Sequence, residues 1–368
     1  MADNKDKKVL NVPHLRFPEF SGEWVNVYLK DVADFQKERI SSGLLDESTY
    51  ISTENILQNF QGVQSAISIP ANTNVVAYKK NDILLSNIRP YLKKVWFSDR
   101  IGGCSADVFV LRSKTCEPEF LYNVIASDKF INYVMSGAKG VKMPRGDKNQ
   151  MESFSFSIPA VAEQRKISRL FQLLDERIAT QNKIIEKYES LIKGIAQKIA
   201  RNNKPNVRLS ECLECSSSTL QESDVCENGT YPIYGANGIV GYLDNYNTEK
   251  EAVYIIKDGS GVGTVSYVTG KCSATGTLNT LQAKEGYSLQ YLYYMLKVFN
   301  FEPYKMGMAI PHIYFKDYGK ANMFCPSYTE QLKYAGLLST IDNKLSAEQS
   351  ILTGLSLQKQ YLLRQMFI

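Results

Sequence analysis

The feature that most constrains this chain is an internal repeat. The segment that begins at Gly140 matches the segment that begins at Gly307, without a gap and at a constant offset of 167 residues. Self-similarity at a fixed period is typical of a duplicated structural unit, so the fold must contain two related halves. Identical pairs include Gly140, Pro144, Pro159, Glu163, Gln164, Lys166, Asp175 and Ile184 in the first copy, and Gly307, Pro311, Pro326, Glu330, Gln331, Lys333, Asp342 and Ile351 in the second.

The second part of each copy has the pattern of a long helix. Apolar residues recur alternately four and three positions apart, which is the spacing of a coiled-coil seam. Each helix of roughly 40 residues should be about 60 Å long at about 1.5 Å per residue. Both seams have a polar residue at the same position, where it commonly sets register. The seams are Ile167, Phe171, Leu174, Ile178, Gln181, Ile185, Tyr188, Ile192, Ile195 and Ile199, and Tyr334, Leu338, Ile341, Leu345, Glu348, Leu352, Leu355, Lys359, Leu362 and Met366.

The stretch before each helix has the pattern of an α+β domain. Runs rich in β-branched and aromatic residues, broken by turns, predict strands, and a helical pattern follows them in both copies. The order of elements is kept while the side chains differ. The strand runs are 75–97 and 106–113 in the first copy and 252–268 and 278–284 in the second, and the helical patterns are 120–135 and 289–299.

Composition indicates a globular protein without a membrane span. The 368 residues are 44% hydrophobic and 22% charged, and the net charge of +5 requires that any strong attraction to nucleic acid come from local clusters of cations. The charged N-terminus has no apolar stretch of signal-peptide length, so we expect a cytoplasmic protein. Seven scattered cysteines predict reduced thiols.

At this point the chain resembles a known family. The start LRFPEFSGEW (15–24), the link IPAVAEQRKISRLFQLLDERI (158–178), its copy CPSYTEQLKYAGLLSTIDNKL (325–345) and the ending LLRQMFI are similar to type I restriction-modification enzyme specificity subunits. The proline, Glu-Gln and Leu-Asp or Ile-Asp spacing occurs twice at one offset, and the resemblance covers essentially the full length.

The resemblance implies an α+β fold of two α/β target-recognition domains, separated by two long antiparallel coiled-coil helices in a pseudo-twofold internal repeat. Each domain would read one half of a split, asymmetric site in double-stranded DNA. The partners implied are two methyltransferase (modification) subunits and restriction subunits, with no membrane. The expected organisation is an N-terminal segment at 1–22, target-recognition domain 1 at 23–160, spacer helix 1 at 161–203, target-recognition domain 2 at 204–327 and spacer helix 2 at 328–368.

Motifs for catalysis are missing from the sequence. An adenine methyltransferase should have an Asn/Asp-Pro-Pro-aromatic motif, and the chain has no Pro-Pro sequence. The glycine cluster from Asp258 to Thr264 lacks the Gly-Lys-Ser/Thr ending of a phosphate-binding loop and leads into a predicted strand. It is either a plain β-turn or a loop whose bare backbone can approach DNA closely. We therefore expect a non-catalytic subunit.

No metal or cofactor is expected. Cys212 and Cys215 form a single Cys-x-x-Cys pair, and His14 and His312 are the chain's two histidines, so a tetrahedral zinc site would have to recruit Cys226 or Cys272. Ordinary buried thiols are the simpler interpretation. Neither histidine lies in a recognisable nucleophile context.

DNA contact needs cations for phosphates and planar donors for base edges. One candidate surface is the basic and aromatic turn SNIRPYLKK, with the loop after Ile256 as its counterpart in the second domain. The other is the repeated Gly-x-x-x-Pro turn, which recurs with changed residues, as readers of two half-sites would require. The predicted DNA-binding residues are Asn87, Arg89, Tyr91, Lys93, Lys94, Lys142, Arg145 and Lys148 in the first domain, and Lys257, Ser260, Thr264, His312, Tyr314 and Lys316 in the second.

Two other functions stay open on the sequence. A coiled-coil scaffold without sequence-specific DNA binding would also use the two seams, and long heptads are most commonly dimer interfaces. A self-contained DNA methyltransferase or nuclease is opposed by the missing motifs. Solvated surface is the plain alternative for the lysine-rich segments.

Overall fold

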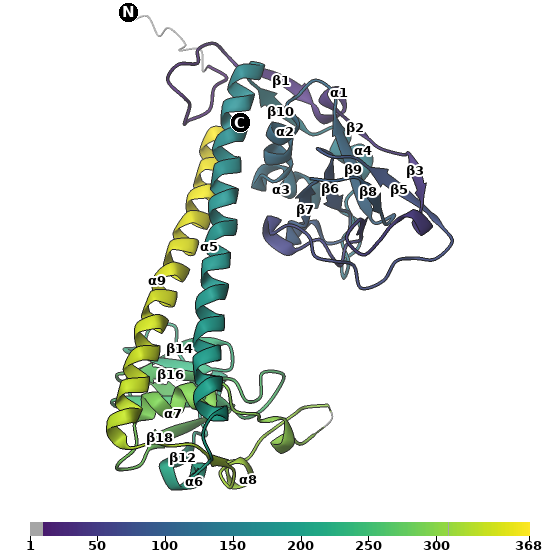
Figure 1. Cartoon of the computed structure of the whole chain (residues 1–368). Coiled ribbons are helices and arrows are strands. Elements are labelled where there is room, and N and C mark those ends of the chain that lie inside the picture. The colour runs from purple at the N-terminus through teal and green to yellow at the C-terminus, as the bar shows by residue number, and fades with distance from the viewer. Residues whose placement is uncertain (1–9, 308) are drawn as a thin grey trace, which may run out of the picture. The chain divides into compact units, whose positions relative to one another are not determined.

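The computed structural model describes residues 10–307 and 309–368. The chain divides into two compact units, Met1–Thr180 with Leu352–Ile368 (unit 1) and Gln181–Ile351 (unit 2). Residues 1–9 of the expected N-terminal segment lie outside the described residues. The helices α5 (Val161–Arg201) and α9 (Tyr328–Met366) each contribute to both units (Figure 1). In the part of the chain that is described, no helix is long and apolar enough to cross a membrane.

Unit 1 contains ten strands among its described residues: β1 (Val25–Tyr28), β2 (Ala33–Phe35), β3 (Arg39–Ser41), β4 (Tyr50–Ile51), β5 (Asn74–Tyr78), β6 (Ile83–Ser86), β7 (Val95–Phe97), β8 (Gly102–Cys104), β9 (Val108–Ser113) and β10 (Ser155–Ile158). One four-stranded sheet has the order β2-β9-β6-β7 and is antiparallel throughout. The second has the order β3-β5-β8-β4, with β4 and β8 parallel. A separate antiparallel pair joins β1 to β10.

The central strand β6 explains how this unit forms its core. Successive side chains of a strand point to opposite faces, so an apolar run is buried when both faces are covered. Ile83 and Leu85 belong to a large cluster with aromatic residues of the helices, whereas Leu84 belongs to a second cluster with Tyr78 and Trp96. All three side chains are almost completely buried. The continuous run in the sequence thus marks a strand with two buried faces.

Four short helices complete unit 1: α1 (Leu29–Val32), α2 (Pro118–Ile125), α3 (Asp128–Ser136) and α4 (Lys148–Glu152). The sequence predicts one helical stretch over 120–135, but the structure divides it. Ser127 has an extended backbone, and its hydroxyl accepts a hydrogen bond from the backbone N–H of Phe130 at 3.2 Å. This serine cap begins a new helix, which the apolar periodicity alone did not indicate.

Unit 2 repeats the first sheet of unit 1 with new residues. Its strands are β11 (Val207–Arg208), β12 (Leu213–Ser217), β13 (Tyr231–Gly235), β14 (Gly238–Leu243), β15 (Glu251–Ile256), β16 (Val265–Thr269), β17 (Ser273–Ala274), β18 (Leu278–Ala283) and β19 (Asn322–Met323), and its short helices are α6 (Leu209–Cys212), α7 (Leu289–Leu296) and α8 (Phe315–Tyr318). The four-stranded sheet has the order β12-β18-β15-β16, strand for strand that of unit 1. A three-stranded sheet β14-β13-β17 and the pair β11-β19 accompany it.

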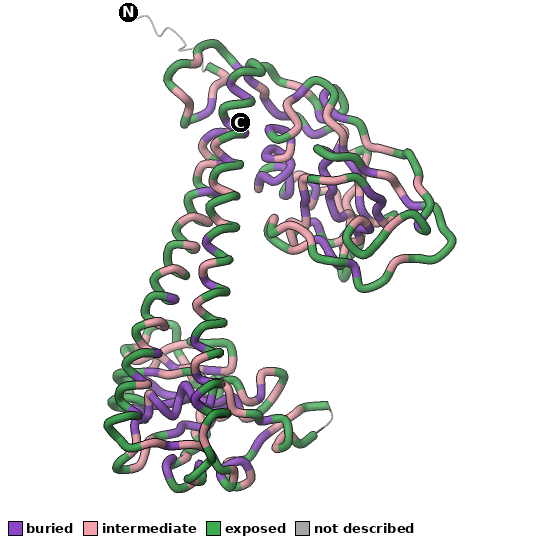
Figure 2. Tube along the Cα trace, viewed as in Figure 1, coloured by how far each residue is buried: buried purple, intermediate pink, exposed green. Residues whose placement is uncertain are grey.

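The seam predicted for the long helices is a buried row. All 20 seam positions are buried or half-buried (Figure 2). Within unit 1, Phe171 of α5 packs against Phe367 of α9 with ring centroids 5.8 Å apart. The polar seam residue Lys359 is 8% exposed, and its Nζ lies 2.5 Å from Asp175 Oδ1. A buried ammonium requires such a partner, so this pair explains how the seam tolerates a lysine.

Within unit 2, the two polar residues predicted at the same seam position contact each other. The Gln181 amide nitrogen donates to the backbone carbonyl of Glu348 at 3.0 Å and also to its carboxylate. Gln181 is 5% exposed, so these bonds replace the water that the amide loses on burial. This pairing fits the expectation that a polar seam residue sets helix register.

The repeated Glu-Gln motif ties each domain to its long helix. Gln164 donates to the Pro159 carbonyl at 2.8 Å and accepts from the backbone N–H of Glu117, the N-cap of α2, at 2.9 Å. Gln331 makes the matching bonds, donating to Pro326 and accepting from Ser288, the N-cap of α7, both at 2.9 Å. Both glutamines are 2% exposed. One side chain thus satisfies the proline carbonyl before the long helix and an N–H at the start of a domain helix.

Candidate nucleic-acid interface

The first candidate loop in unit 1 follows β6. Arg89 has a left-handed backbone with φ +51°, which costs a non-glycine residue about 1–2 kcal/mol. Pro90 is buried and begins the short helical turn Pro90–Leu92, and Lys93 is left-handed again at φ +51°. Such strained backbone persists only where neighbouring structure holds it. For Arg89 that structure is the second candidate loop.

The second candidate loop is closed at its base by two backbone hydrogen bonds. Lys139 donates to Arg145 at 3.0 Å, and Arg145 donates to Lys139 at 2.9 Å. Gly140 has φ +95°, a conformation that favours glycine, and this explains the recurring glycine. The tip between them exposes Val141 completely and Met143 at 46%.

The structure joins these two loops into one surface. The Arg89 N–H donates to the Pro144 carbonyl at 2.8 Å, and the Gly146 N–H donates to Asn87 at 3.1 Å. The Asn87 N–H in turn donates to the carbonyl of Asp107, just before β9, at 2.8 Å. We call residues 87–89 with 139–146 the paired loops of unit 1. Surfaces that the sequence suggested separately are therefore adjacent.

The predicted side chains of unit 1 differ in availability. The side chains of Arg89 and Lys142 are exposed and have no hydrogen-bond or ion-pair partner among the residues that the structure describes, and Tyr91 is 48% exposed. Arg145 is half exposed and pairs with Asp107 at 2.7 Å. The remaining lysines already have partners: Lys93 contacts Asp128 at 2.5 Å, Lys94 donates to the Thr53 carbonyl at 2.6 Å, and Lys148 contacts Glu152 at 3.4 Å.

Unit 2 contains the same paired loops. The Lys257 N–H donates to the Thr277 carbonyl at 3.0 Å, the Gly259 N–H to Pro311 at 2.9 Å, and the Ile313 N–H to Lys257 at 2.9 Å. Met306 and His312 close the second loop with reciprocal bonds of 2.9 and 2.8 Å. We call residues 257–259 with 306, 307 and 309–313 the paired loops of unit 2. Every backbone bond described for unit 1 thus has a counterpart here.

The two sets of paired loops have the same backbone connections but different side chains. By these bonds the equivalent positions of units 1 and 2 are Asn87 and Lys257, Ile88 and Asp258, Arg89 and Gly259, Asp107 and Thr277, and Arg145 and His312. Gly259 has φ +97° and Arg89 has φ +51°, so the backbone has a positive φ at this position in both copies. A fixed backbone with changed donors and acceptors can present two different recognition surfaces.

The other predicted residues of unit 2 surround its paired loops. His312 packs edge-on against Tyr314 with ring centroids 5.0 Å apart, and Lys316 Nζ lies 5.1 Å from the Tyr314 ring. Ser260 and Thr264 are exposed in the turn between β15 and β16, and Lys257 is half-buried. The turn leads into a strand, as the sequence predicts, and not into a phosphate-binding helix.

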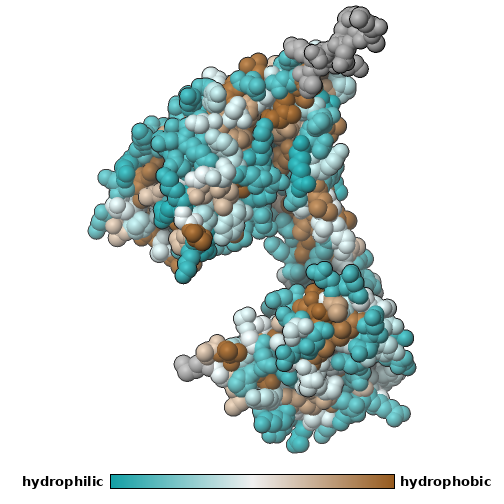
Figure 3. All heavy atoms as spheres, turned by 180° about the vertical axis from the view of Figure 1, so that it is seen from behind, coloured by the Kyte–Doolittle hydropathy of each residue, from teal (hydrophilic) through white to brown (hydrophobic). Residues whose placement is uncertain are grey.

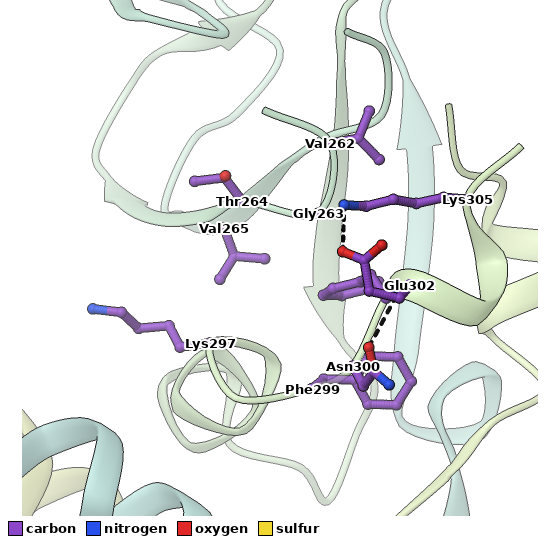
Figure 4. A pocket seen from close by; sticks show the side chains of 10 residues that line it. Val262, Gly263, Thr264, Val265, Lys297, Phe299, Asn300, Glu302 and Lys305 are labelled. Atoms are coloured by element: carbon purple, nitrogen blue, oxygen red, sulfur yellow. Dashed lines mark hydrogen bonds and ion pairs between the residues drawn. The ribbon is translucent and has the colours of Figure 1, made fainter. Parts of the chain in front are cut away.

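A pocket of about 400 Å³ adjoins this turn (Figure 4). Thr264 and Val265 line it from the turn, with Lys297, Asn300, Glu302 and Lys305 on the facing segment. Lys305 Nζ lies 2.6 Å from Glu302 Oε1, so the two charges compensate each other. The lining residues include no nucleophile paired with a general base.

The cysteines of the described ranges are free thiols, and in those ranges no cluster of three or more His, Cys, Asp or Glu could hold a metal ion. Burial raises the pKa of Cys104 to about 12 and that of Cys215 to about 11. Because a metal binds the thiolate, a raised pKa opposes ligation. Cys212 is buried, and its Sγ lies 3.4 Å from the Leu209 carbonyl oxygen.

Sequence reasoning missed Asp107 and Thr277. Asp107 is the second residue of the predicted strand run 106–113, and Thr277 directly precedes the run 278–284. Nothing in their local pattern indicates that their carbonyls hold a loop about 20 residues earlier in the chain. The one signal available is their similar position before β9 and β18. On the face drawn in Figure 3 hydrophilic residues predominate and apolar residues form patches among them.

Known proteins share this fold. A solved specificity subunit of a type I restriction-modification system from M. genitalium is similar with a TM-score of 0.65 and 17% identity, over 97% of this chain and 99% of that one. A chain from a structure on complex assembly and conformational transition of the type I restriction-modification system has a TM-score of 0.53 and 19% identity, over 92% and 96% of the two chains. These likenesses show that the α+β fold is the one found in such subunits.

Curated relatives give the same family in sequence. The EcoDI specificity subunit of Escherichia coli is 23% identical over 50% of this chain and 43% of its own length, and the MjaVIII specificity subunit of Methanocaldococcus jannaschii is 25% identical over 53% and 45%. Each match thus spans less than half the relative's length. The model of the type I restriction modification DNA specificity domain matches twice, at residues 21–190 and 203–356. The chain therefore belongs to the type I restriction-modification DNA specificity family and contains two copies of its defining domain.

Proposed function

We propose that this chain is the DNA-specificity subunit of a type I restriction-modification complex and performs no catalysis itself. It reads a bipartite, asymmetric target in double-stranded DNA and directs adenine methylation and restriction by partner subunits. The observation that carries this proposal is the pair of matching loop sets. Their backbone bonds are the same in the two units, whereas Arg89, Arg145 and Asn87 are replaced by Gly259, His312 and Lys257.

The chemistry of the exposed side chains supports recognition of DNA. Arginine can donate two hydrogen bonds to the major-groove edge of guanine, and lysine neutralises phosphates. Arg89, Lys142 and Arg145 supply these groups in unit 1, and Lys257, His312 and Lys316 supply cationic or hydrogen-bonding groups in unit 2. We propose these residues, with Tyr91, Ser260, Thr264 and Tyr314, as the main contacts. Lys93, Lys94 and Lys148 would have to exchange their present partners to reach DNA.

We further propose that α5 and α9 form an antiparallel coiled coil that separates two target-recognition domains with pseudo-twofold symmetry. The buried seam, the Lys359–Asp175 pair and the Gln181–Glu348 pair support it. The order of these pairs is the argument for antiparallel packing, because the later position on α5 meets the earlier one on α9. The proposed domains are residues 23–160 and 204–327, and the spacers are 161–203 and 328–368.

The partners we propose are two methyltransferase subunits, which bind the spacer, and restriction subunits that join them. Apolar side chains that are exposed on the long helices suit such contacts, because they are not buried within this chain and can be buried by a partner. They include Leu173 and Leu191 on α5 and Leu337, Leu357 and Tyr361 on α9. A protein that acts on the DNA of its own cell would work in the cytoplasm.

The experiment is to produce this chain together with its cognate methyltransferase subunits and to map N6-methyladenine across DNA that the mixture has modified. We expect one split motif with two unlike halves. A protein-only scaffold would leave methylation unchanged when the chain is omitted. A self-contained methyltransferase would modify DNA in the absence of the partner subunits.

A further inference from the structure

Asp107 touches both paired loops of unit 1, each through a different group. It immediately precedes β9, and its backbone carbonyl accepts a hydrogen bond from the Asn87 N–H at 2.8 Å. Its side chain extends to the other loop, where Asp107 Oδ1 accepts from Arg145 Nη1 at 2.7 Å. The backbone contact supports the first loop, and the carboxylate fixes the arginine of the second.

The Asp107–Arg145 ion pair leaves the guanidinium available. A guanidinium has five N–H donors in a rigid plane, and a single bond to Asp107 engages one of them. The two side chains are 50% and 38% exposed. Arg145 is therefore oriented by Asp107 while its remaining donors face solvent or a ligand. An exposed ion pair of this kind adds little to the free energy of folding, so we look for its role in binding.

Unit 2 shows that the fold does not require the carboxylate. Thr277 occupies the matching position, and its carbonyl accepts from the Lys257 N–H at 3.0 Å. Its hydroxyl is engaged with the Thr275 hydroxyl at 2.8 Å. Unit 2 has His312 at the position equivalent to Arg145. The same backbone bonds therefore form with threonine, and the carboxylate occurs where an arginine faces it.

We propose that Asp107 is a positioning residue that holds the Arg145 guanidinium for bidentate recognition of a guanine in the half-site read by unit 1. The inference rests on the proposed function and deepens it. A tethered planar donor pair matches guanine O6 and N7 and no other base edge in the major groove. The carboxylate also repels phosphates, so it lowers the affinity of this surface for DNA in general. Asp107 thereby raises the ratio of specific to nonspecific binding.

The test uses the complex of this chain with its methyltransferase subunits, a library of randomised DNA duplexes, and the variant D107T. Threonine is the residue that unit 2 has at this position, so the variant should fold. We expect discrimination at one guanine of the first half-site to fall about 10-fold or more. Binding to nonspecific duplex should be unchanged or tighter, with a salt dependence steeper by up to about one unit of slope. Reading of the second half-site should not change.

R145A and the double variant D107T/R145A distinguish positioning from general damage. If Asp107 acts through Arg145, the double variant discriminates no worse than R145A alone. Equal and additive losses at both half-sites, or full discrimination by D107T, would overturn the proposal. Failure of the unmodified complex to select any sequence would instead refute the proposed function. Those two results are distinct, because the second is measured without any substitution.

Discussion

The buried glutamines of the repeated motif give the sharpest test of how each domain is anchored. Replacing Gln331 by alanine removes the donor to the Pro326 carbonyl and the acceptor for the Ser288 N–H. The Ser288 contact is buried, and the Pro326 contact is partly buried. A buried polar group left without a partner costs about 1–3 kcal/mol, so we expect a loss of about 2–4 kcal/mol for the two groups together.

The measurement is amide hydrogen exchange at the start of α7, with urea unfolding as a second readout. A chain with two units need not unfold in one step, so the local exchange rate is the more direct quantity. We expect faster exchange at Ser288 and the following residues. Gln358 is an exposed glutamine of α9, the helix that also contains Gln331, and Gln358→Ala serves as the matched control. If Gln331→Ala changed exchange and the urea midpoint no more than this control, the anchoring argument would be refuted.

Four further outcomes are expected. Arg145→Ala should relax reading of one half-site only, measured by methylation mapping, and equal loss at both would contradict the two-reader model. The isolated chain should neither methylate nor cut DNA, and activity with partners rigorously excluded would contradict a non-catalytic role. The hydrogen bond from Lys93 lowers the pKa of Asp128, so ionised Asp128 stabilises the fold above the unfolded pKa near 3.8, and this stabilisation is lost as pH falls through the folded pKa. Lys93→Met should therefore make the stability of unit 1 less sensitive to acid between about pH 5 and 2, as measured by thermal melting. Lengthening α5 alone after Ile199 should leave the half-site spacing unchanged, because Gln331 and the Tyr294–Asp342 hydrogen bond of 3.1 Å also hold the second domain on α9. Matched seven-residue insertions in both α5 and α9 should change the spacing between the half-sites and keep both half-sequences.

The long helices could be predicted from the sequence because one physical rule governs them. Seam positions recur with the coiled-coil period, so they can be identified from the spacing of apolar residues along one segment of the chain. The repeat predicts long helices at 161–203 and 328–368, and the structure has α5 at Val161–Arg201 and α9 at Tyr328–Met366. Lys359 was predicted as a polar seam position, but its partner Asp175 lies 184 residues away in the chain. No local pattern indicates such a pair.

The candidate site was only partly predictable for the same reason. Arg89 and Arg145 attract attention as basic residues in turns, but the bonds that bring their loops together run from Arg89 to Pro144 and from Gly146 to Asn87. Backbone groups make these bonds, and every residue except proline has the same backbone N–H and carbonyl. The sequence therefore does not indicate which of them will pair. The ion pairs of Lys93 with Asp128 and of Lys148 with Glu152 could not be predicted either, because the sequence does not distinguish these two acidic residues from other acidic residues in helices.

The Gly-x-x-x-Pro spacing can now be explained by the contacts of the paired loops. Gly140 and Gly307 have φ values of +95° and +87°, and a Cβ atom added there would lie 3.2 and 2.5 Å from the carbonyl oxygens of Met143 and Ile310. Pro144 and Pro311 supply the carbonyls that hold Arg89 and Gly259. Glycine is therefore required by the backbone of the loops, whereas the position after the proline differs between the copies, Arg145 in one and His312 in the other. Under the proposed function, a duplicated domain changes the base that it reads by changing this residue, and the backbone of the loops stays the same.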